Sequence, residues 1–289
     1  MSMIAQELAS QPTCWARAQM LAPEVADVLP APHERVLAIG CGTSLHVARA
    51  YAGLRETAGV GDTDARPASE DATRTYDRVL AISRSGTTTE VARLLASRPE
   101  PSIALVGVDS SPVAERATSV VSLAFADEGS VVQTRFATTA LALLRAHLGH
   151  DLEIAIADAE RALAEPLPAD PSAFDHFVFL GRGWTVGLAD EAALKMREAS
   201  LSFAESYPAL EYRHGPISLA GARSLVWGLG EIEPDLLGDV RRTGATVVAG
   251  ELDPMAELVR IQRLAVALAE AKGLDPDRPR HLTRSVVLT

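Results

Sequence analysis

The sequence predicts an α/β protein with parallel sheets in two related halves, and three observations support this. Short apolar runs rich in β-branched residues and leucine alternate with longer alanine-rich segments of helical periodicity. Each short run is apolar on both faces, which is typical of a strand inside a parallel sheet. A similar strand and turn occurs twice, as VLAIGCGT at Val36 to Thr43 and VFLGRGWT at Val178 to Thr185. This repeat favours a duplication.

The first half, residues 1–150, has the pattern of one domain. Its strands are expected near residues 35–39, 78–82, 103–108 and 120–125. Its helices are expected near residues 44–56, 88–96 and 134–147, after a further helix at the N-terminus.

A proline-rich segment separates this half from the next. Three prolines in Pro166-Leu167-Pro168-Ala169-Asp170-Pro171 preclude a helix there, and an acidic, alanine-rich helix near 151–165 precedes them. We therefore expect a helical and proline-rich linker at 151–172 and a second domain at 173–289. In that domain we expect strands near 176–180, 225–229 and 246–249, and helices near 185–203, 234–241 and 255–271.

The composition is that of a globular protein and limits its partners. The chain has 289 residues, of which 47% are hydrophobic and 22% charged. A net charge of −11 without a basic stripe argues against a nucleic-acid partner. The sequence has no leader-like segment and no apolar run near the roughly 20 residues that a bilayer requires, so we expect a cytoplasmic protein that does not enter membranes. Cys14 and Cys41 provide no disulfide framework.

The turn from Gly40 to Ser44 is the first candidate anion site. It joins a strand to a helix start, where unpaired amides and the helix dipole favour a negative charge. It is not a dinucleotide fingerprint, because Leu45 occupies the place of the third glycine, and no Walker lysine follows. The alternative is a tight turn in which Thr43 or Ser44 caps the helix.

A second loop, SRSGTT at 83–88, carries the stronger signal. It places the hydroxyls of Ser83, Ser85, Thr87 and Thr88 around Gly86, directly after a buried strand. Thr87 and Glu90 also fit a capping box, so the loop could simply start a helix. Capping needs one hydroxyl, and four favour an oxyanion such as a phosphate. Arg84 would either add a charge-assisted contact or point to solvent.

The second half carries candidate proton-transfer groups. Glu191, Lys195 and Glu198 are spaced by four and three residues, so they lie near one helix face. The alternative is an exposed ion pair with another acid beside it, which contributes about 0.3 to 0.5 kcal/mol. His214 lies in the polar turn EYRHGP, where it is either a proton carrier near neutral pH or a surface residue.

Two other chemistries are disfavoured. Cys41 as a nucleophile lacks an evident histidine and acid partner and lies between two glycines. The seven histidines are scattered, so we predict no metal and no cofactor.

With these segments in this order, the chain resembles the sugar isomerase (SIS) superfamily over nearly its whole length. The resemblance is closest to the isomerase domain of glucosamine-6-phosphate synthase and to aminosugar-phosphate deaminases. It implies two tandem SIS domains, each a three-layer αβα sandwich around a mostly parallel sheet. The stretches that carry it are GCGTS at Gly40 to Ser44, SRSGTTTE at Ser83 to Glu90, FLGRG at Phe179 to Gly183, EAALKMREASLSFAESY at Glu191 to Tyr207, EYRHGP at Glu211 to Pro216 and DPDRPRHLTRSV at Asp275 to Val286.

The resemblance also implies roles for individual residues. Glu198 would move a proton between C1 and C2 of a sugar phosphate, with Lys195 beside it, and His214 of a neighbouring subunit would help to open the sugar ring. A homodimer is therefore expected. The phosphate and nearby hydroxyls would be held by Thr43, Ser44, Ser83, Arg84, Ser85 and Thr88, with Val131 and Gln133 lining the pocket. Arg284 of the C-terminal tail is also expected among the substrate-binding residues.

Two departures from the family pattern affect the expected chemistry. Arg284 occupies the place of a Schiff-base lysine in the C-terminal tail, and arginine does not deprotonate to act as an amine nucleophile. No glutaminase domain precedes the sugar domain, so we expect no ammonia from glutamine. In the second half, the acids of GEIEP at 230–234 replace the hydroxyl-rich loop, so one substrate site per chain is expected.

The sequence thus predicts an enzyme that converts an aminohexose or ketohexose phosphate by aldose–ketose isomerisation, with deamination as a close variant. A carboxylate that shuttles a proton and nearby charge that stabilises an oxyanion suit that reaction. One alternative is a deglycase that splits an amine from a phosphorylated fructosamine. Another is a non-catalytic sugar-phosphate sensor, which Arg284 favours, whereas Glu198, His214 and the lack of a basic helix-turn-helix segment argue against it.

Overall fold

The computed structural model describes residues 2–70 and 73–288 and contains two parallel sheets. In these residues the first sheet has five strands in the order β2-β1-β3-β4-β5, and the second has four in the order β7-β6-β8-β9. Each neighbouring pair is parallel, which confirms the predicted α/β class. The strands are β1 (Val36–Gly40), β2 (Thr63–Pro67), β3 (Arg78–Ser83), β4 (Ser102–Val106), β5 (Ser119–Ser122), β6 (His176–Gly181), β7 (Phe203–Pro208), β8 (Ser224–Leu229) and β9 (Thr246–Ala249).

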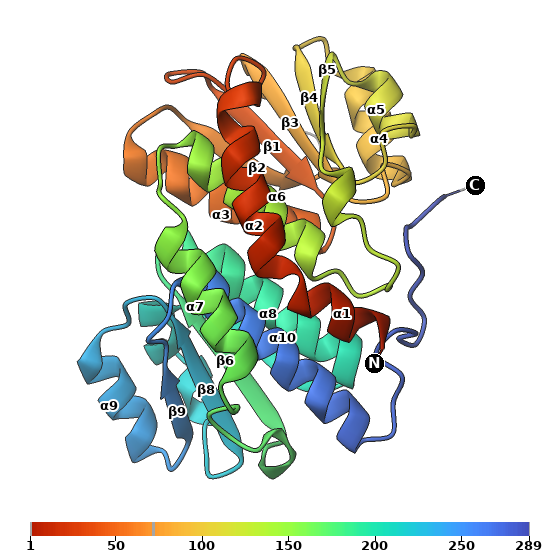
Figure 1. Cartoon of the computed structure of the whole chain (residues 1–289). Helices are drawn as coiled ribbons and strands as arrows, with labels where there is room; N and C mark the ends of the chain where they lie inside the picture. The colour runs from red at the N-terminus through yellow and green to blue at the C-terminus, as the bar shows by residue number, and fades with distance from the viewer. Residues whose placement is uncertain (1, 71–72, 289) are drawn as a thin grey trace.

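The helices lie between and outside the two sheets (Figure 1). They are α1 (Met3–Ala9), α2 (Gln11–Leu21), α3 (Thr43–Ala58), α4 (Thr89–Ser97), α5 (Pro112–Arg116), α6 (Arg135–His147), α7 (Glu153–Ala164), α8 (Thr185–Ser200), α9 (Pro234–Arg242) and α10 (Pro254–Ala271). Short 3-10 turns occur at η1 (Ala22–Val25), η2 (Ala124–Ala126), η3 (Pro171–Ala173), η4 (Ala209–Arg213) and η5 (Pro216–Leu219).

Alternate residues of the central strands enter different cores. Leu80 and Ile82 of β3 share the main core with Phe177 and Phe179 of β6, and α2, α3, α6, α8 and α10 contribute to the same core. The opposite face of the first sheet packs on α4 and α5, and that of the second sheet on α9. Both faces of the central strands are therefore buried, which explains why their sequences are continuously apolar.

Helices α3 and α8 join the two halves through a backbone contact at two glycines. A Cβ atom added to Gly187 of α8 would lie 2.6 Å from Ala50 N and His46 O of α3. A Cβ atom added to Gly53 of α3 would lie 2.8 Å from Trp184 Cα, next to the start of α8. At these two positions the helix backbones therefore lie too close together to leave room for a side chain. Helix α3 begins at the Gly40 to Ser44 turn, so the contact also fixes this turn relative to α8.

The first expected helix of the C-terminal domain, near 185–203, is shorter than predicted. Instead of reaching Phe203, α8 ends at Ser200, because Leu201 adopts a left-handed conformation with φ 51°. Phe203 begins the edge strand β7. The sequence FAESYP has neither the continuous apolar run of the central strands nor a strict alternation, so no strand was predicted there.

Other elements differ in detail. The strand expected at 120–125 is β5, which ends at Ser122 and gives way to η2. Edge strand β2 was not predicted, because its sequence TDARP is polar and its residues are only half-buried.

The N-terminal helix is two helices, and Pro12 lies in the first turn of the second. The amides of Met3 and Ile4 donate to the Asp277 carboxylate at 2.9 and 2.8 Å, which ties α1 to the C-terminal tail.

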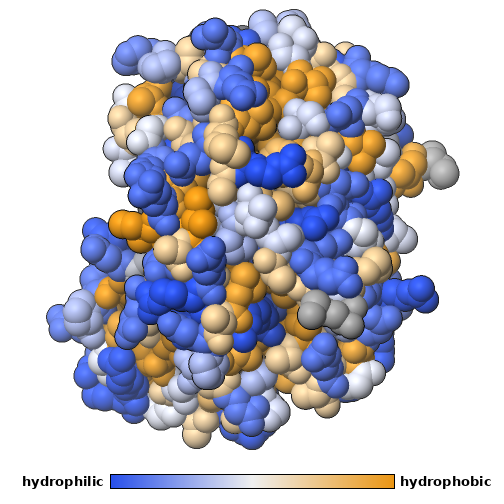
Figure 2. Space-filling model, in the orientation of Figure 1, coloured by the Kyte–Doolittle hydropathy of each residue, from blue (hydrophilic) through white to orange (hydrophobic). Residues whose placement is uncertain are grey.

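The surface seen in Figure 2 mixes hydrophilic residues with small apolar patches. Among the described residues, no helix is both long enough and apolar enough to cross a bilayer.

The close contact of α3 and α8 makes Gly187 intolerant of a side chain. We expect Gly187→Ala to lower the free energy of unfolding by about 1 to 3 kcal/mol, because the added methyl group overlaps the α3 backbone. Gly238→Ala in α9 is the matched control: its Cβ would meet only Arg242 Nη1 at 3.7 Å, so helix propensity should leave stability unchanged or raise it by about 1 kcal/mol. Urea denaturation measures both, and equal stabilities of the two variants would contradict the close approach.

Candidate functional site

A cavity of about 160 Å³ lies at the carboxyl ends of β1 and β3, where ligands bind in open parallel sheets. Glu198 of α8 lines it, as does the C-terminal tail around Arg284. All the residues predicted to bind phosphate or line the pocket also face it, namely Thr43, Ser44, Ser83, Arg84, Ser85, Thr88, Val131 and Gln133. The chain therefore brings into one cavity groups from both halves.

A larger hollow of about 1070 Å³ lies at the other end of the first sheet, beside Arg35 and Arg74. It is an open groove at the amino ends of the strands, and none of the predicted motifs lines it. In the second half, the place equivalent to the smaller cavity, at the carboxyl ends of β6 and β8, is lined by Glu231 and Glu233, and Glu233 pairs with Arg182 at 2.9 Å. The chemistry of the side chains thus identifies the smaller cavity as the candidate site.

The first turn carries Thr43 into the contact between the two halves. Gly42, with φ 54°, is the residue before α3, and no side chain caps the helix, so the capping alternative for Thr43 and Ser44 is wrong. Instead, Thr43 Oγ1 donates to Glu191 Oε1 at 3.2 Å and accepts from Lys195 Nζ at 2.9 Å. The hydroxyl of the first half is therefore bound to the charged groups of α8.

The second loop is shaped by Gly86, which has φ 64° and would place a Cβ atom 1.9 Å from Ser111 Oγ. The predicted capping box is wrong, because α4 starts at Thr89 and no side chain caps it. Thr87 Oγ1 lies instead 2.8 Å from Ser285 Oγ of the tail and 3.0 Å from Ser85 Oγ. The hydroxyls of Ser85 and Thr87 thus bond to one another and to the C-terminal tail rather than capping the helix.

Arg84 is buried rather than directed to solvent, with 2% of its surface exposed. Its Nη1 donates to Ser130 O at 2.6 Å, and its Nη2 donates to Arg284 O at 2.6 Å. Burial lowers the pKa of its guanidinium, and the charge of Glu128 opposes that shift. Arg84 therefore connects the loop to two other walls of the cavity, and direct contact with a phosphate stays a prediction.

The alternative of an exposed ion pair on α8 is wrong, because the side chains of Glu191 and Lys195 are each only 2% exposed. Lys195 Nζ lies 3.3 Å from Glu191 Oε1 and 2.5 Å from Glu198 Oε2. Glu198 is the member of the three that lines the cavity, with 20% of its side chain exposed. The cavity therefore contains a carboxylate with an ammonium group behind it, as proton transfer with charge stabilisation requires.

Burial and neighbouring charges shift the pKa values of Glu191 and Lys195. Burial raises the pKa of Glu191 to about 7, although Lys195 acts in the opposite direction. Burial alone would lower the pKa of Lys195, but Glu191 and Glu198 outweigh it and raise the pKa. Lys195 is thus charged near neutral pH, whereas Glu191 is partly protonated.

Two buried oxygens of the cavity have no protein partner among the described residues. Ser83 Oγ and Gln133 Oε1 both belong to lining residues and make no hydrogen bond to that part of the chain. Because buried polar groups are almost always satisfied, these atoms fit a ligand rich in hydroxyl and phosphate oxygens.

The structure does not bring His214 into this cavity. It is exposed, directly after η4, and is not among the lining residues. Leu210 and Leu219 on the same segment are 45% and 61% exposed. A role for His214 within one chain is therefore not supported, and its role in a neighbouring subunit stays a prediction.

Cys41 lines the cavity, and burial followed by the charge of Glu90 raises the pKa of its thiol. A raised pKa leaves less thiolate, which agrees with the prediction that it is not a nucleophile. In residues 2–70 and 73–288 no cluster of three or more potential metal ligands occurs.

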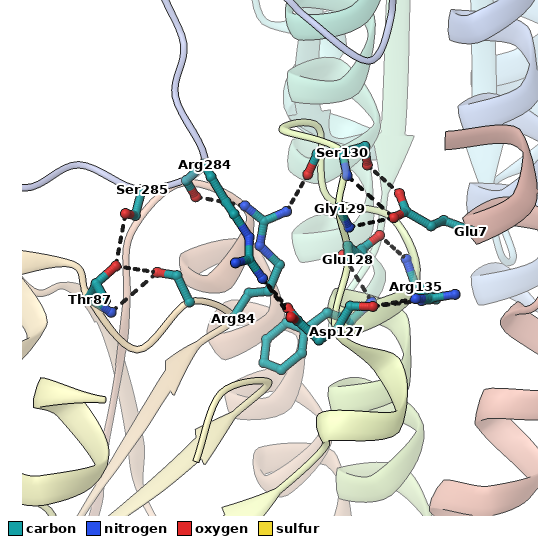
Figure 3. Close-up of polar contacts among 12 residues, drawn as sticks. Glu7, Arg84, Thr87, Asp127, Glu128, Gly129, Ser130, Arg135, Arg284 and Ser285 are labelled. Carbon is teal, nitrogen blue, oxygen red and sulfur yellow. Dashed lines mark hydrogen bonds and ion pairs between the residues drawn. The ribbon is translucent and has the colours of Figure 1, made fainter. Parts of the chain in front are cut away.

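Sequence reasoning missed a polar network behind the cavity (Figure 3). Glu7 of α1 accepts from the amides of Gly129 and Ser130 at 2.6 and 3.3 Å and also from Ser130 Oγ. The fully buried Glu128 accepts from the amides that open α6. Arg284 Nη2 lies 2.6 Å from both carboxylate oxygens of Asp127. The contacts of Glu7 and Arg284 join distant parts of the chain, so no local sequence motif predicts them.

Comparison with known proteins identifies sequence relatives but no family model. No protein-family model matches the chain. The chain is 28% identical over 295 residues to glutamine–fructose-6-phosphate aminotransferase of Sulfurisphaera tokodaii, covering 88% of this chain and 50% of the relative. The enzyme of the same name from a Nostoc species is 28% identical over 326 residues, covering 88% and 52%. The chain thus spans about half the length of these curated relatives.

Solved structures show the same fold over the whole chain. Glucosamine-6-phosphate deaminase from Thermotoga maritima matches with a TM-score of 0.83 and 28% identity, covering 99% of this chain and 100% of that one. Tagatose-6-phosphate ketose/aldose isomerase from Escherichia coli matches with a TM-score of 0.81 and 18% identity, covering 96% and 95%, which shows a shared fold alone.

The raised pKa of Glu191 predicts a pH-dependent stability. The folded chain binds this proton more tightly than the unfolded chain, so the free energy of unfolding should fall as pH rises from about 4.5 to about 7. Glu191→Gln removes this titration. Urea denaturation at about pH 5 and about pH 8 should therefore show wild type losing stability relative to Glu191→Gln. Glu56→Gln, at an exposed position of α3, should follow wild type; identical pH profiles for all three would refute the assignment.

Proposed function

We propose that this chain, whose fold and sequence relatives support the sugar isomerase (SIS) superfamily, is an enzyme acting on an aminohexose 6-phosphate by aldose–ketose isomerisation, deamination or both. The observation that carries the proposal is the single cavity that holds both the hydroxyl-rich loop and the Glu198 carboxylate backed by Lys195.

We also propose that the two halves are tandem SIS domains at 1–150 and 173–289. The strand orders β2-β1-β3-β4 and β7-β6-β8-β9 are equivalent, and a glycine turn into a helix follows the first strand of each half. The polar loop is present only in the first half, which supports one substrate site per chain.

In this proposal the phosphate binds at the Thr43–Ser44 turn and the 83–88 loop, with Val131 and Gln133 lining the sugar. The unpartnered Ser83 hydroxyl supports this placement. Glu198 removes the proton from C2 of the open-chain sugar and returns it to C1. Lys195, whose ammonium nitrogen lies 2.5 Å from Glu198 Oε2, stabilises the negative charge that develops on the substrate oxygen.

Deamination is compatible with Arg284 in the place of the family lysine. An arginine forms no imine with a substrate carbonyl, but an aminosugar brings its own nitrogen at C2. Moving the proton from C2 to C1, while another proton passes from the nitrogen to the C1 oxygen, converts the amino aldehyde into an imine at C2. Water then adds to that carbon and ammonia leaves, so an aminohexose phosphate and water yield a ketohexose phosphate and ammonia. No lysine nucleophile is needed. The T. maritima deaminase is the solved structure above with 28% identity, which supports this direction.

We propose that His214 acts on the site of a second copy in a homodimer. Within its own chain it lies outside the cavity, on a segment that exposes Leu210 and Leu219. Apolar residues at that place are suited to burial against another copy.

The first test is Glu198→Gln. Loss of the base should lower kcat by about 100- to 10,000-fold, because general base catalysis contributes that much. Substrate binding should persist, since the hydroxyl-rich loop is unchanged. Ketose formation and ammonia release are followed on a panel of hexose and aminohexose 6-phosphates, and calorimetry measures binding.

Glu231→Gln in the second-half loop is the control and should retain turnover. Unchanged turnover of Glu198→Gln would remove the proposed proton transfer. If wild type binds sugar phosphates but converts none of the panel, the chain is a sensor rather than an enzyme. Release of an amine other than ammonia from phosphorylated fructosamines would identify a deglycase.

The second test mixes two inactive variants. His214→Ala and Glu198→Gln chains, combined into dimers, should recover about a quarter of wild-type activity, because half the dimers are mixed and each then has one intact site. If His214 acts within its own chain, both sites of a mixed dimer are defective and no activity returns.

A further inference from the structure

We propose that Asp127 is a positioning residue that, through its ion pair with Arg284, holds the C-terminal tail in place as one wall of the substrate cavity. The expected effect on KM rests on the proposed function, whereas the expected effect on the position of the tail does not.

The tail is an exposed segment that nevertheless shapes the cavity. Residues Leu282 to Val286 line it, although most of the tail is open to solvent. Figure 1 shows the tail leaving α10 and crossing toward α4 of the first half. It is held there by Thr89 N, which donates to Val286 O at 3.2 Å, and by Leu288 N, which donates to Thr89 Oγ1 at 2.9 Å. Because few contacts hold the tail, the position of this cavity wall depends on each of them.

Arg284 is held at both its backbone and its side chain. The backbone carbonyl accepts from the buried Arg84, and the guanidinium contacts both oxygens of Asp127 (Figure 3). Arg84 also donates to Ser130 O, three residues after Asp127. The tail and the 127–133 segment are therefore connected twice, and Val131 and Gln133 of that segment line the cavity.

Asp127 is a rigid support for this contact. Its carbonyl accepts from Arg135 Nε at 3.1 Å and also from Arg135 Nη2. Glu128, next along the chain, holds the start of α6. Asp127 itself is not among the residues that line the cavity. The guanidinium of Arg284 thus pairs with a residue outside the cavity lining. Arg284 therefore has a positioning role at the place where the family pattern has a reactive lysine.

The negative charge of Asp127 also allows Arg84 and Arg284 to lie near one another. Arg84 and Arg284 repel one another, and Asp127 and Glu128 offset that repulsion. Removing the Asp127 charge therefore weakens the attraction that holds the tail and leaves the repulsion that drives Arg284 away.

The experiment compares Asp127→Asn and Arg284→Gln with wild type. Hydrogen exchange of residues 282–288, read by mass spectrometry without substrate, should become about fivefold faster in both variants, the factor that a partly exposed ion pair supports. The KM for the aminosugar phosphate should rise by a similar factor with kcat nearly unchanged. Arg284→Lys keeps the opposite charges and should retain most of the protection.

Asp175→Asn is the matched control, because it breaks the exposed Arg223–Asp175 pair away from the cavity. It should leave the tail and the KM unchanged. The charge-exchanged double variant Asp127→Arg with Arg284→Asp should recover protection relative to either of its single changes, which a general loss of packing would not do.

Unchanged tail exchange in both Asp127→Asn and Arg284→Gln would overturn the inference. If the tail loosens in these variants while wild type converts no sugar phosphate, the positioning contact stands and the proposed function fails. A melting temperature equal to that of wild type shows that the exchange reports the tail alone.

Discussion

The backbone contact between α3 and α8 is the constraint on which the site depends. At Gly53 and Gly187 the two helices approach without side chains between them, so the first turn of α3 is fixed beside the middle of α8. Only at that separation does the hydroxyl of Thr43 reach both Lys195 and Glu191. A phosphate-binding turn from one half and a proton-transferring helix from the other thereby face one cavity.

The buried trio on α8 is stable only as a unit. Burying an isolated ammonium group is costly, and a pair of carboxylates offsets that cost only with close geometry and further hydrogen bonds. Here the Thr43 hydroxyl supplies one of those bonds, and the cavity end of the trio keeps Glu198 in contact with solvent. Lys195 is therefore buried behind Glu198, and Glu198 carries the charged end of the trio at the edge of the cavity.

The strands, the glycine turns and the residues that line the cavity could be predicted because their signals are local. The apolar run before Ser83 and the hydroxyls after it lie within a few residues of one another. The trio on α8 follows from helical spacing, although its burial does not, since it depends on α3. Edge strands β2 and β7 lack the continuous apolar run of a buried strand, and their pairing is decided by the neighbouring β1 and β6. The positions of Glu7, Asp127 and Arg284 required the folded chain, because their partners are far away in sequence.

Helix α1 touches no part of the cavity, yet its two ends are bound to the segments that form it. Asp277 of the tail holds its first amides, and Glu7 holds the amides of Gly129 and Ser130. Trimming this apparently peripheral helix would leave those amides and the Ser130 hydroxyl without their acceptor and release the tail at its base. An N-terminal affinity tag on this chain therefore belongs on a linker long enough to spare residues 3–9.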